Sequence, residues 1–287
     1  MSGLLTFSDP LGPKGRRKAL IGSVLGALFL LLLLVLAVGK FAEAGQLDSK
    51  RWSDLLSADV AQLLARGLVA TLKAAASAIV ISLAFGTLMA LGRLSTRAPV
   101  RWLASTYVQL FRALPSLLLI IFAFFAIPQI IDRPVSRYVA LVIGLSLYNS
   151  AVFAEIIRAG VLSLPKGQTE AAKAIGLRSH QVQQLVVLPQ AISRMLPSLV
   201  AQMVVVLKDT SYGFIIGYEE LLRRGQNAGE FTGDLLQAYL IVAVVYVAVC
   251  FTLSQVARWL EGRTRSKYSG TDGPTAQTTP VLETAST

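Results

Sequence analysis

A series of long apolar stretches, each long enough to cross a lipid bilayer, constrains this sequence most. The first, residues 19–38, reads ALIGSVLGALFLLLLLVLAV and contains no charged side chain. Because an α-helix rises about 1.5 Å per residue, twenty residues cover the roughly 30 Å hydrocarbon core of a membrane. These stretches predict an all-α integral membrane protein with six spans, at residues 19–38, 68–92, 110–131, 138–160, 196–217 and 235–259.

The composition supports the same class of protein. With 54% hydrophobic and 15% charged residues, the 287-residue chain is too apolar for a soluble domain. The net charge of +11 is compatible with nucleic-acid binding, but the basic residues are dispersed around the apolar spans instead of forming one polar face. Cys250 lies within an apolar run and His180 has no other ligand type at a suitable spacing, so we predict neither a disulfide nor a metal site.

The basic residues also predict the orientation of the chain. Cytoplasmic segments of membrane proteins carry an excess of Lys and Arg. The tail 1–18, the region around residues 93–101, the segment 161–195 and the residues after 257 have this excess, whereas acids are frequent between residues 218 and 234. We therefore expect a multi-pass membrane protein with both termini in the cytoplasm.

The chain before the second span raises two questions. A cleaved signal peptide is an alternative for residues 19–38, because Ala42-Glu43-Ala44 resembles a cleavage site. Signal peptides, however, have apolar regions of only about 7–15 residues, which favours a retained span. Residues 39–66 mix acids and bases like an extracytoplasmic loop, and RWSDLLSADVAQLLARG repeats apolar residues at helical spacing. We expect this second half to lie on the membrane surface as an amphipathic helix.

The polar segment EAAKAIGLRSHQVQQLVVLPQ, residues 170–190, predicts a fixed shape. Pro165 suits an early helical position, and Gly176 suits a left-handed helix end. Ser179 can cap a second short helix, which Pro189 would limit. Two short helices that meet at a glycine form a compact helical knob, although an ordinary loop hairpin is the alternative.

The same segment resembles the EAA signature of ABC importer permeases, which is Glu-Ala-Ala, three residues, Gly, and a later Leu-Pro. The matching residues are Glu170, Ala171, Ala172, Gly176, Leu188 and Pro189. Further stretches, NSAVFAEIIRAGVLSLPKGQTEAAKAIGL and LKDTSYGFIIGYEELL, resemble the permeases of glutamate, glutamine, histidine and arginine uptake. The resemblance implies a five-span permease domain at residues 67–260 in a bacterial cytoplasmic membrane, with 19–38 as an additional helix. The composition of the last segment, 261–287, predicts a disordered tail.

The resemblance also implies the partners. In that family the loop, here residues 161–195, is a coupling helix that seats in a separate ATPase, and the two small alanines would let the partner's backbone approach. ATP and Mg²⁺ would bind to an ATPase dimer, since this sequence has no G-x-x-x-x-G-K-[ST] phosphate-binding loop. A second permease chain, identical or paralogous, and an extracytoplasmic solute-binding protein that delivers a polar amino acid complete the expected complex. This chain itself is expected to be a transport subunit and not an enzyme.

Four charged residues within the spans are candidates for the substrate path: Glu155, Arg158, Lys208 and Asp209. A charge inside a membrane is costly and normally faces protein or water. Glu155 and Arg158 lie three residues apart and could form an ion pair, whereas Thr210, Ser211 and Gly213 suggest a locally opened helix after Asp209. The alternative is that these charges only hold helices or subunits together. They would also fit an ion-gradient-driven transporter, but we find no inverted repeat, and no nucleophile and base pair favours a membrane enzyme.

Overall fold

The computed structural model describes residues 12–268, which are helical with short connections and contain no strand. Residues 1–11 of the expected basic tail and residues 269–287 of the expected disordered tail lie outside this range. The chain divides into two compact units, one ending at Ser57 and the other beginning at Ala58.

The first unit contains α1 (Pro13–Glu43) and α2 (Ser49–Leu55). Pro13 begins α1 at a position that needs no backbone N–H. The candidate span within this helix runs over 29 residues, Gly15–Glu43. The Oδ1 atom of Asp48 accepts a hydrogen bond from the Lys50 N–H at 3.1 Å and caps the start of α2.

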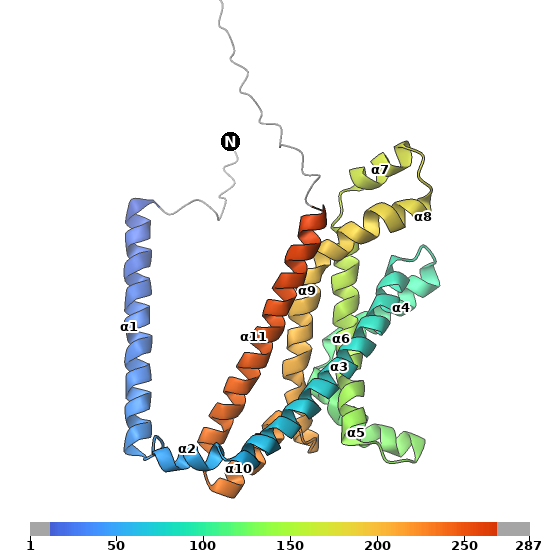
Figure 1. Ribbon diagram of the computed structural model, residues 1–287. Helices are drawn as coiled ribbons and strands as arrows, with labels where there is room; N and C mark the ends of the chain where they lie inside the picture. Colours follow the sequence, from blue (N-terminus) through green and yellow to red (C-terminus); the bar gives the residue numbers. More distant parts are fainter. Residues whose placement is uncertain (1–11, 269–287) are drawn as a thin grey trace, which may run out of the picture. The chain divides into compact units, whose positions relative to one another are not determined.

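The second unit forms a bundle of long helices with a helical projection at one end (Figure 1). Its α-helices are α3 (Ala58–Leu94), α4 (Ala98–Ala113), α5 (Ser116–Ile131), α6 (Arg137–Leu162), α7 (Lys166–Ala174), α8 (Ser179–Val182), α9 (Leu188–Asp209), α10 (Leu221–Thr232) and α11 (Leu235–Tyr268). A π-helix, η1 (Gln183–Val187), joins α8 to α9, and a 3-10 helix, η2 (Thr210–Ile216), follows α9.

The number of spans agrees with the prediction if one bent pair of helices counts as a single span, and three features of the helices were not predicted. Five helical segments are long and apolar enough to cross a membrane, and the pair α4 and α5 makes a sixth if it counts as one span. This pair bends by 98° where Pro115 precedes α5, as expected of a proline that kinks or bounds the third span, but the apolar path begins earlier than residue 110, at Ala98 of α4. Residues 58–66, expected on the membrane surface, form the first turns of α3. The short helix α10 between the last two spans was not predicted.

Small residues let the helices of the core approach closely. A Cβ atom on Gly144 of α6 would lie 2.6 Å from the backbone N and Cα atoms of Ile120 in α5. One on Gly86 of α3 would lie 2.7 Å from the Ser150 carbonyl oxygen of α6. Close backbone approach of this kind is typical of helix packing in membranes, where lipid removes most of the hydrophobic drive between helices. α6 therefore lies at the centre of the second unit, against α3, α5 and α9.

Candidate functional site

The helical knob, residues 163–187, projects from one end of the bundle (Figure 1). Its first helix, α7, begins after Pro165 and ends as the glycine predicts. Gly176 has φ +87°, its N–H donates to the Lys173 carbonyl at 2.9 Å, and the Leu177 N–H donates to the Ala172 carbonyl at 3.2 Å. These two bonds form a Schellman motif, which satisfies carbonyls at the end of a helix and favours glycine at the left-handed position.

The knob has a small hydrophobic core of its own. Ala172, Val182 and Val187 are buried in it, with Leu164 and Leu177 packed against them. The expectation that both alanines offer a small surface to a partner is therefore wrong for Ala172, because helical periodicity turns its side chain into this core. Ala171 is exposed.

The exposed surface of the knob includes large apolar side chains as well. Ile175, directly before the glycine, is 80% exposed, and Leu185 is 65% exposed. Glu170 and Leu188 are exposed too. Apolar side chains on a polar segment outside the spans are a feature of interaction surfaces.

Pro189 does not limit the second short helix, contrary to the prediction. α8 begins at Ser179, and Oε1 of Gln181 accepts a hydrogen bond from the Arg178 N–H at 2.9 Å. The helical path then continues through η1 into α9, and Pro189 lies in the first turn of α9. Proline lacks an N–H and its ring clashes with the carbonyl four residues earlier, so a local π-helix relieves the conflict without ending the helix.

The base of the knob is tied to both helices that carry it. An Nη1 atom of Arg194 in α9 donates to the Ser163 carbonyl at the end of α6, at 2.7 Å. A Cβ atom on Gly160 would lie 2.9 Å from the Met195 Cβ, which brings α6 and α9 together just below the knob. A displacement of the knob therefore acts on α6 and α9 together.

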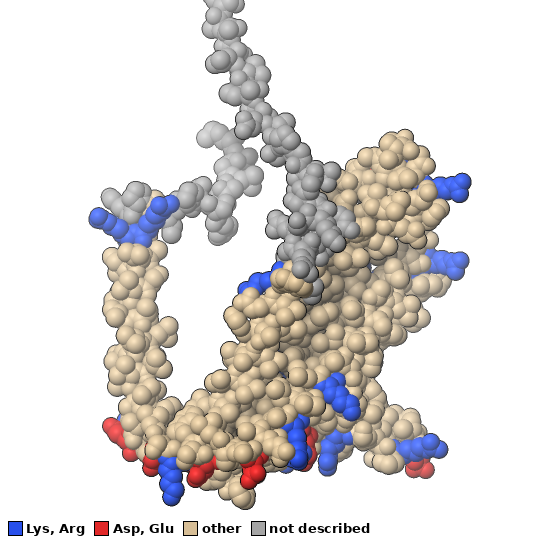
Figure 2. Space-filling model, in the orientation of Figure 1, with Lys and Arg blue, Asp and Glu red and all other residues tan. Residues whose placement is uncertain are grey.

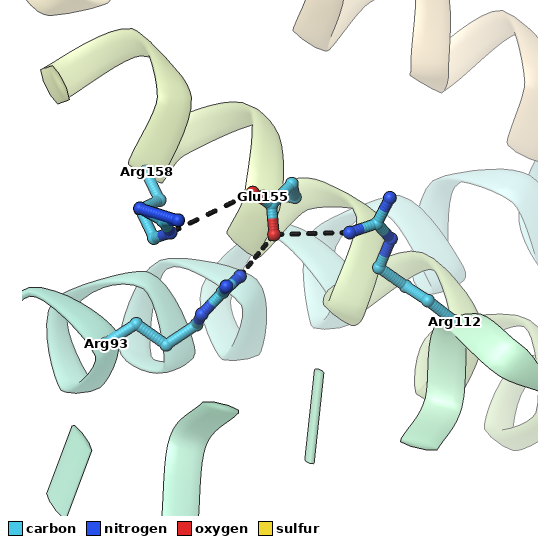
Figure 3. Close-up of polar contacts among 4 residues, drawn as sticks. All are labelled: Arg93, Arg112, Glu155 and Arg158. Atoms are coloured by element: carbon cyan, nitrogen blue, oxygen red, sulfur yellow. Dashed lines mark hydrogen bonds and ion pairs between the residues drawn. The ribbon is translucent and has the colours of Figure 1, made fainter. Parts of the chain in front are cut away.

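Glu155 in α6 is surrounded by three arginines from three helices (Figure 3). It forms an ion pair with Arg93 of α3, and its Oε2 lies 3.2 Å from Nη1 of Arg112 in α4. The predicted pair with Arg158 is present, but its 3.8 Å distance is longer than the one to Arg112. Arg93 and Arg112 were not predicted as partners of Glu155. Arg93 ends the second predicted span, and the next acid in the sequence is Asp132, after the third span. A partner for Arg93 from a distant segment could therefore have been suspected.

Lys208 and Asp209 lie elsewhere, at the end of α9. Lys208 is exposed and lines an open groove of about 570 Å³ with Phe214, Tyr239 and Tyr246. Asp209 is half-buried, and neither residue forms an ion pair with another described residue. The regular α-helix ends here, but the chain does not open as predicted: it continues from Thr210 as the 3-10 helix η2, which is wound more tightly than an α-helix.

The packing of α6 against α9 separates these two groups of charges. The helices run antiparallel, with Gly160 facing Met195 and the Asn149 Oδ1 accepting from Gln202 Nε2 at 2.8 Å. Glu155 is therefore nearly level with residue 198, and Asp209 lies roughly 16 Å further along the bundle at 1.5 Å per residue. The four candidates do not form one site.

A buried carboxylate that the sequence did not predict lies at the same end as Asp209. Glu220 is fully buried and caps α10, accepting from the N–H groups of Leu222 at 2.8 Å and Arg223 at 2.7 Å. The Tyr246 hydroxyl of α11 donates to it at 2.7 Å. Burial raises the pKa of the Glu220 carboxyl above its ordinary value, against the lowering effect of these hydrogen bonds. Because glutamate is not a usual capping residue, the sequence did not predict this role for Glu220.

Comparison with known protein families identifies a match over most of the second unit. Residues 82–266 match the family described as binding-protein-dependent transport system inner membrane component.

Within the range that the structure describes, no group of three His, Cys, Asp or Glu side chains could hold a metal ion.

Several named permease proteins are similar in sequence. The glutamate transport system permease protein GluD of Corynebacterium glutamicum is 39% identical over 225 residues, which cover 77% of this chain and 82% of GluD. The glutamate/aspartate import permease protein GltK of Escherichia coli O6:H1 is 33% identical, with 69% and 92% covered. The probable glutamine ABC transporter permease protein GlnP of Bacillus subtilis is 37% identical, with 69% and 91% covered.

Solved structures share the fold of the second unit. A chain of an amino acid ABC transporter solved with histidines has a TM-score of 0.68 and 30% identity, covering 71% of this chain and 95% of its own length. The MetNI methionine ABC transporter in an inward-facing conformation has a TM-score of 0.60 at 20% identity, with 73% and 99% covered. At 20% identity, the similarity to MetNI shows the shared fold alone.

Proposed function

This chain belongs to the family of binding-protein-dependent transport system inner membrane components, and on that premise we propose that it imports a polar amino acid as the membrane-spanning subunit of an ABC transporter. The named relatives GluD and GltK favour an acidic amino acid such as glutamate, and GlnP keeps glutamine within the same class. These relatives support an ATP-driven importer over the ion-gradient-driven alternative.

The helical knob is the feature that supports coupling of this chain to a separate ATPase. It has a fixed backbone, its own core and an exposed apolar edge at Ile175 and Leu185. We propose that this edge docks on a separate ATPase, which binds ATP and Mg²⁺. Because Arg194 and the contact at Gly160 tie the base of the knob to α6 and α9, ATP-driven movement of the docked ATPase would tilt these two helices.

The remaining partners follow from the class of transporter. An ATPase dimer requires a second permease chain, a copy of this one or a paralogue, and a solute-binding protein delivers the amino acid from outside. The charge distribution supports an orientation with the knob in the cytoplasm. On the face seen in Figure 2, acids occur together with Lys and Arg at the end opposite the knob, whereas the knob end shows Lys and Arg without acids.

The four charged candidates take two roles in this proposal. Lys208 and Asp209, without ion-pair partners among the described residues and next to the 3-10 helix η2, would line the path and hold the carboxylate and ammonium of the amino acid transiently. Glu155 and Arg158 belong to a cluster that connects α3, α4 and α6. Their role would be to keep these helices together while the path opens and closes.

Substitution of Gly176 tests the docking proposal. Gly176→Asp adds a side chain at a left-handed position, where other residues are strained by about 1 kcal/mol or more, and a charge beside Ile175. We expect the protein to insert in the membrane but to lose ATPase association, measured by co-purification, and amino-acid uptake.

Two controls separate docking from backbone strain. Gly176→Asn is tolerated better at a left-handed position and adds no charge, so it should retain most of the association. Gly233→Asp makes the same substitution at another left-handed glycine, φ +77°, with open space around it at the far end of the bundle. It should leave association unchanged, and normal uptake by Gly176→Asp would refute docking through this edge.

A further inference from the structure

An open groove lies at the end of the second unit opposite the helical knob. It has a volume of about 540 Å³, within the range of small-molecule sites. Its walls come from α5, the start of α6 and the segment that follows η2, and they include Phe124, Ser136, Arg137, Gly217, Tyr218 and Glu219. The groove is distinct from the one lined by Lys208.

The groove contains one side chain of each charge. Arg137 is exposed and forms neither a hydrogen bond nor an ion pair with another residue that the structure describes. Its guanidinium lies against the backbone of Gly217, where a Cβ atom would be 3.5 Å from Nε. It also occupies the first turn of the 26-residue helix α6, whose N-terminal dipole adds to the positive potential. Glu219 pairs with Arg224 through Oε2, and its side chain is 55% exposed.

The wall between these charges is held in place. Tyr218 donates from its hydroxyl to the Ala70 carbonyl at 3.1 Å and from its backbone N–H to the Gly213 carbonyl at 2.8 Å. Its ring lies 6.1 Å from that of Tyr138, and Phe124 covers another side of the groove. A site with fixed aromatic walls and charges of both signs suits a small ligand that carries a carboxylate and an ammonium.

We propose that this groove receives a free amino acid, with Arg137 binding a carboxylate and Glu219 the ammonium. The proposal rests on the proposed import function and its orientation, and it adds a first binding site at the extracytoplasmic end, before the path at Lys208 and Asp209. A phosphoethanolamine lipid headgroup has the same pair of charges, so the experiment must separate it from an amino acid.

Protection of a cysteine in the groove tests the proposal. In the complete transporter carrying Cys250→Ser and Ser136→Cys, held in phosphatidylcholine nanodiscs without ATP, the alkylation rate of residue 136 is measured with increasing L-glutamate, L-glutamine or L-arginine. We expect a saturable loss of alkylation with at least one of them. N-acetyl-glutamine, which lacks the ammonium, and the α-amide of glutamine, which lacks any carboxylate, should need about tenfold more ligand or fail to protect, since each lacks one charged contact.

Variants connect the protection to the two charges. Arg137→Gln and Glu219→Gln should each abolish it, whereas Arg133→Gln and Glu230→Gln, which remove the same charges from the surface outside the groove, should retain it. The proposal is overturned if no amino acid protects, if the blocked derivatives protect equally, if protection survives in both groove variants, or if phosphoethanolamine protects as well as the amino acids. Such failure together with normal uptake would leave the import function intact.

Discussion

Glu155 shows how one carboxylate can organise several cations inside a membrane protein. Three guanidinium groups converge on it, so the cluster retains an excess of positive charge even when Glu155 is ionised. Removing the carboxylate would leave Arg93, whose side chain is only 11% exposed, facing Arg112 and Arg158 without compensation. Loss of the partner of a largely buried charge such as Arg93 is more harmful than the net contribution of the pair suggests, whereas Arg112, 48% exposed, can be solvated.

Comparison of Glu155→Gln with Asp209→Asn tests the two roles. We expect Glu155→Gln to lower the thermal unfolding temperature of the purified protein, at a cost of about 3 kcal/mol. Asp209→Asn, which breaks no ion pair among the described residues, should assemble and retain ATPase stimulation by the binding protein while uptake falls or substrate preference shifts. If Asp209→Asn transports as the parent does, Asp209 is not on the substrate path. An unchanged unfolding temperature for Glu155→Gln would exclude its structural role.

Glu220 predicts a dependence of stability on pH. Its folded-state pKa lies above that of the unfolded chain, so between these two values the folded protein keeps a proton that the unfolded chain releases. This contribution to stability is present at low pH and is lost as pH rises through that interval, which begins at about 4.3. We expect the unfolding temperature of Glu220→Gln, relative to the parent, to rise with pH from that value towards neutrality. Exposed Glu230→Gln is the control, and an identical pH profile for both variants would contradict the assignment.

At the scale of elements, close helix crossings determine how α6 is held. The nearest one joins Gly144 to the backbone of Ile120 in α5, where no flexible side chain can move away. Elsewhere the helices deviate from regular geometry at identifiable residues: Pro115 separates α4 from α5, Pro189 follows the π-helix η1 by two residues, and Gly176 ends α7. At each deviation the chain changes direction or helical geometry where a regular helix would continue.

Gly144→Ala tests the crossing of α5 and α6. The added methyl group would lie 2.6 Å from backbone atoms of Ile120, so the helices must separate. We expect a destabilisation of about 1–3 kcal/mol, seen as a lower unfolding temperature of the purified protein. Gly167→Ala is the matched control, because a methyl group at Gly167 in α7 meets nothing within 4 Å. Equal unfolding temperatures for the two variants would show that the crossing tolerates a larger separation.

At the scale of the whole molecule, the orientation of the chain is the first property to test. In a Cys250→Ser background, we expect Asp48→Cys to react with a membrane-impermeant thiol reagent in intact cells. Thr96→Cys, in the connection between α3 and α4, should react only after lysis. Both native residues are exposed, so burial within the chain would not mask the result. Reaction of Thr96→Cys in sealed cells would reverse the orientation and with it the proposed docking side of the knob.

The sequence determined the properties that depend on local pattern. Apolar length predicted the spans, because lipid requires every backbone hydrogen bond to be satisfied within a helix. Gly176 and Pro165 predicted the ends of α7, because both residues restrict or permit particular backbone angles independently of distant contacts. The resemblance of residues 170–190 to a permease signature predicted the family for the same reason: its residues are close together in the chain.

Only the tertiary structure decided which distant residues meet. Arg93, Arg112 and Glu155 are far apart in sequence, and their meeting depends on how α3 and α4 cross α6. Helical phase decided that Ala172 faces the core of the knob while Ala171 remains exposed, a distinction that two adjacent alanines do not reveal. Glu220 and the groove at Arg137 depend in the same way on segments brought together by packing. The burial and the contacts of a charged side chain are set by residues that are near in space but distant in sequence.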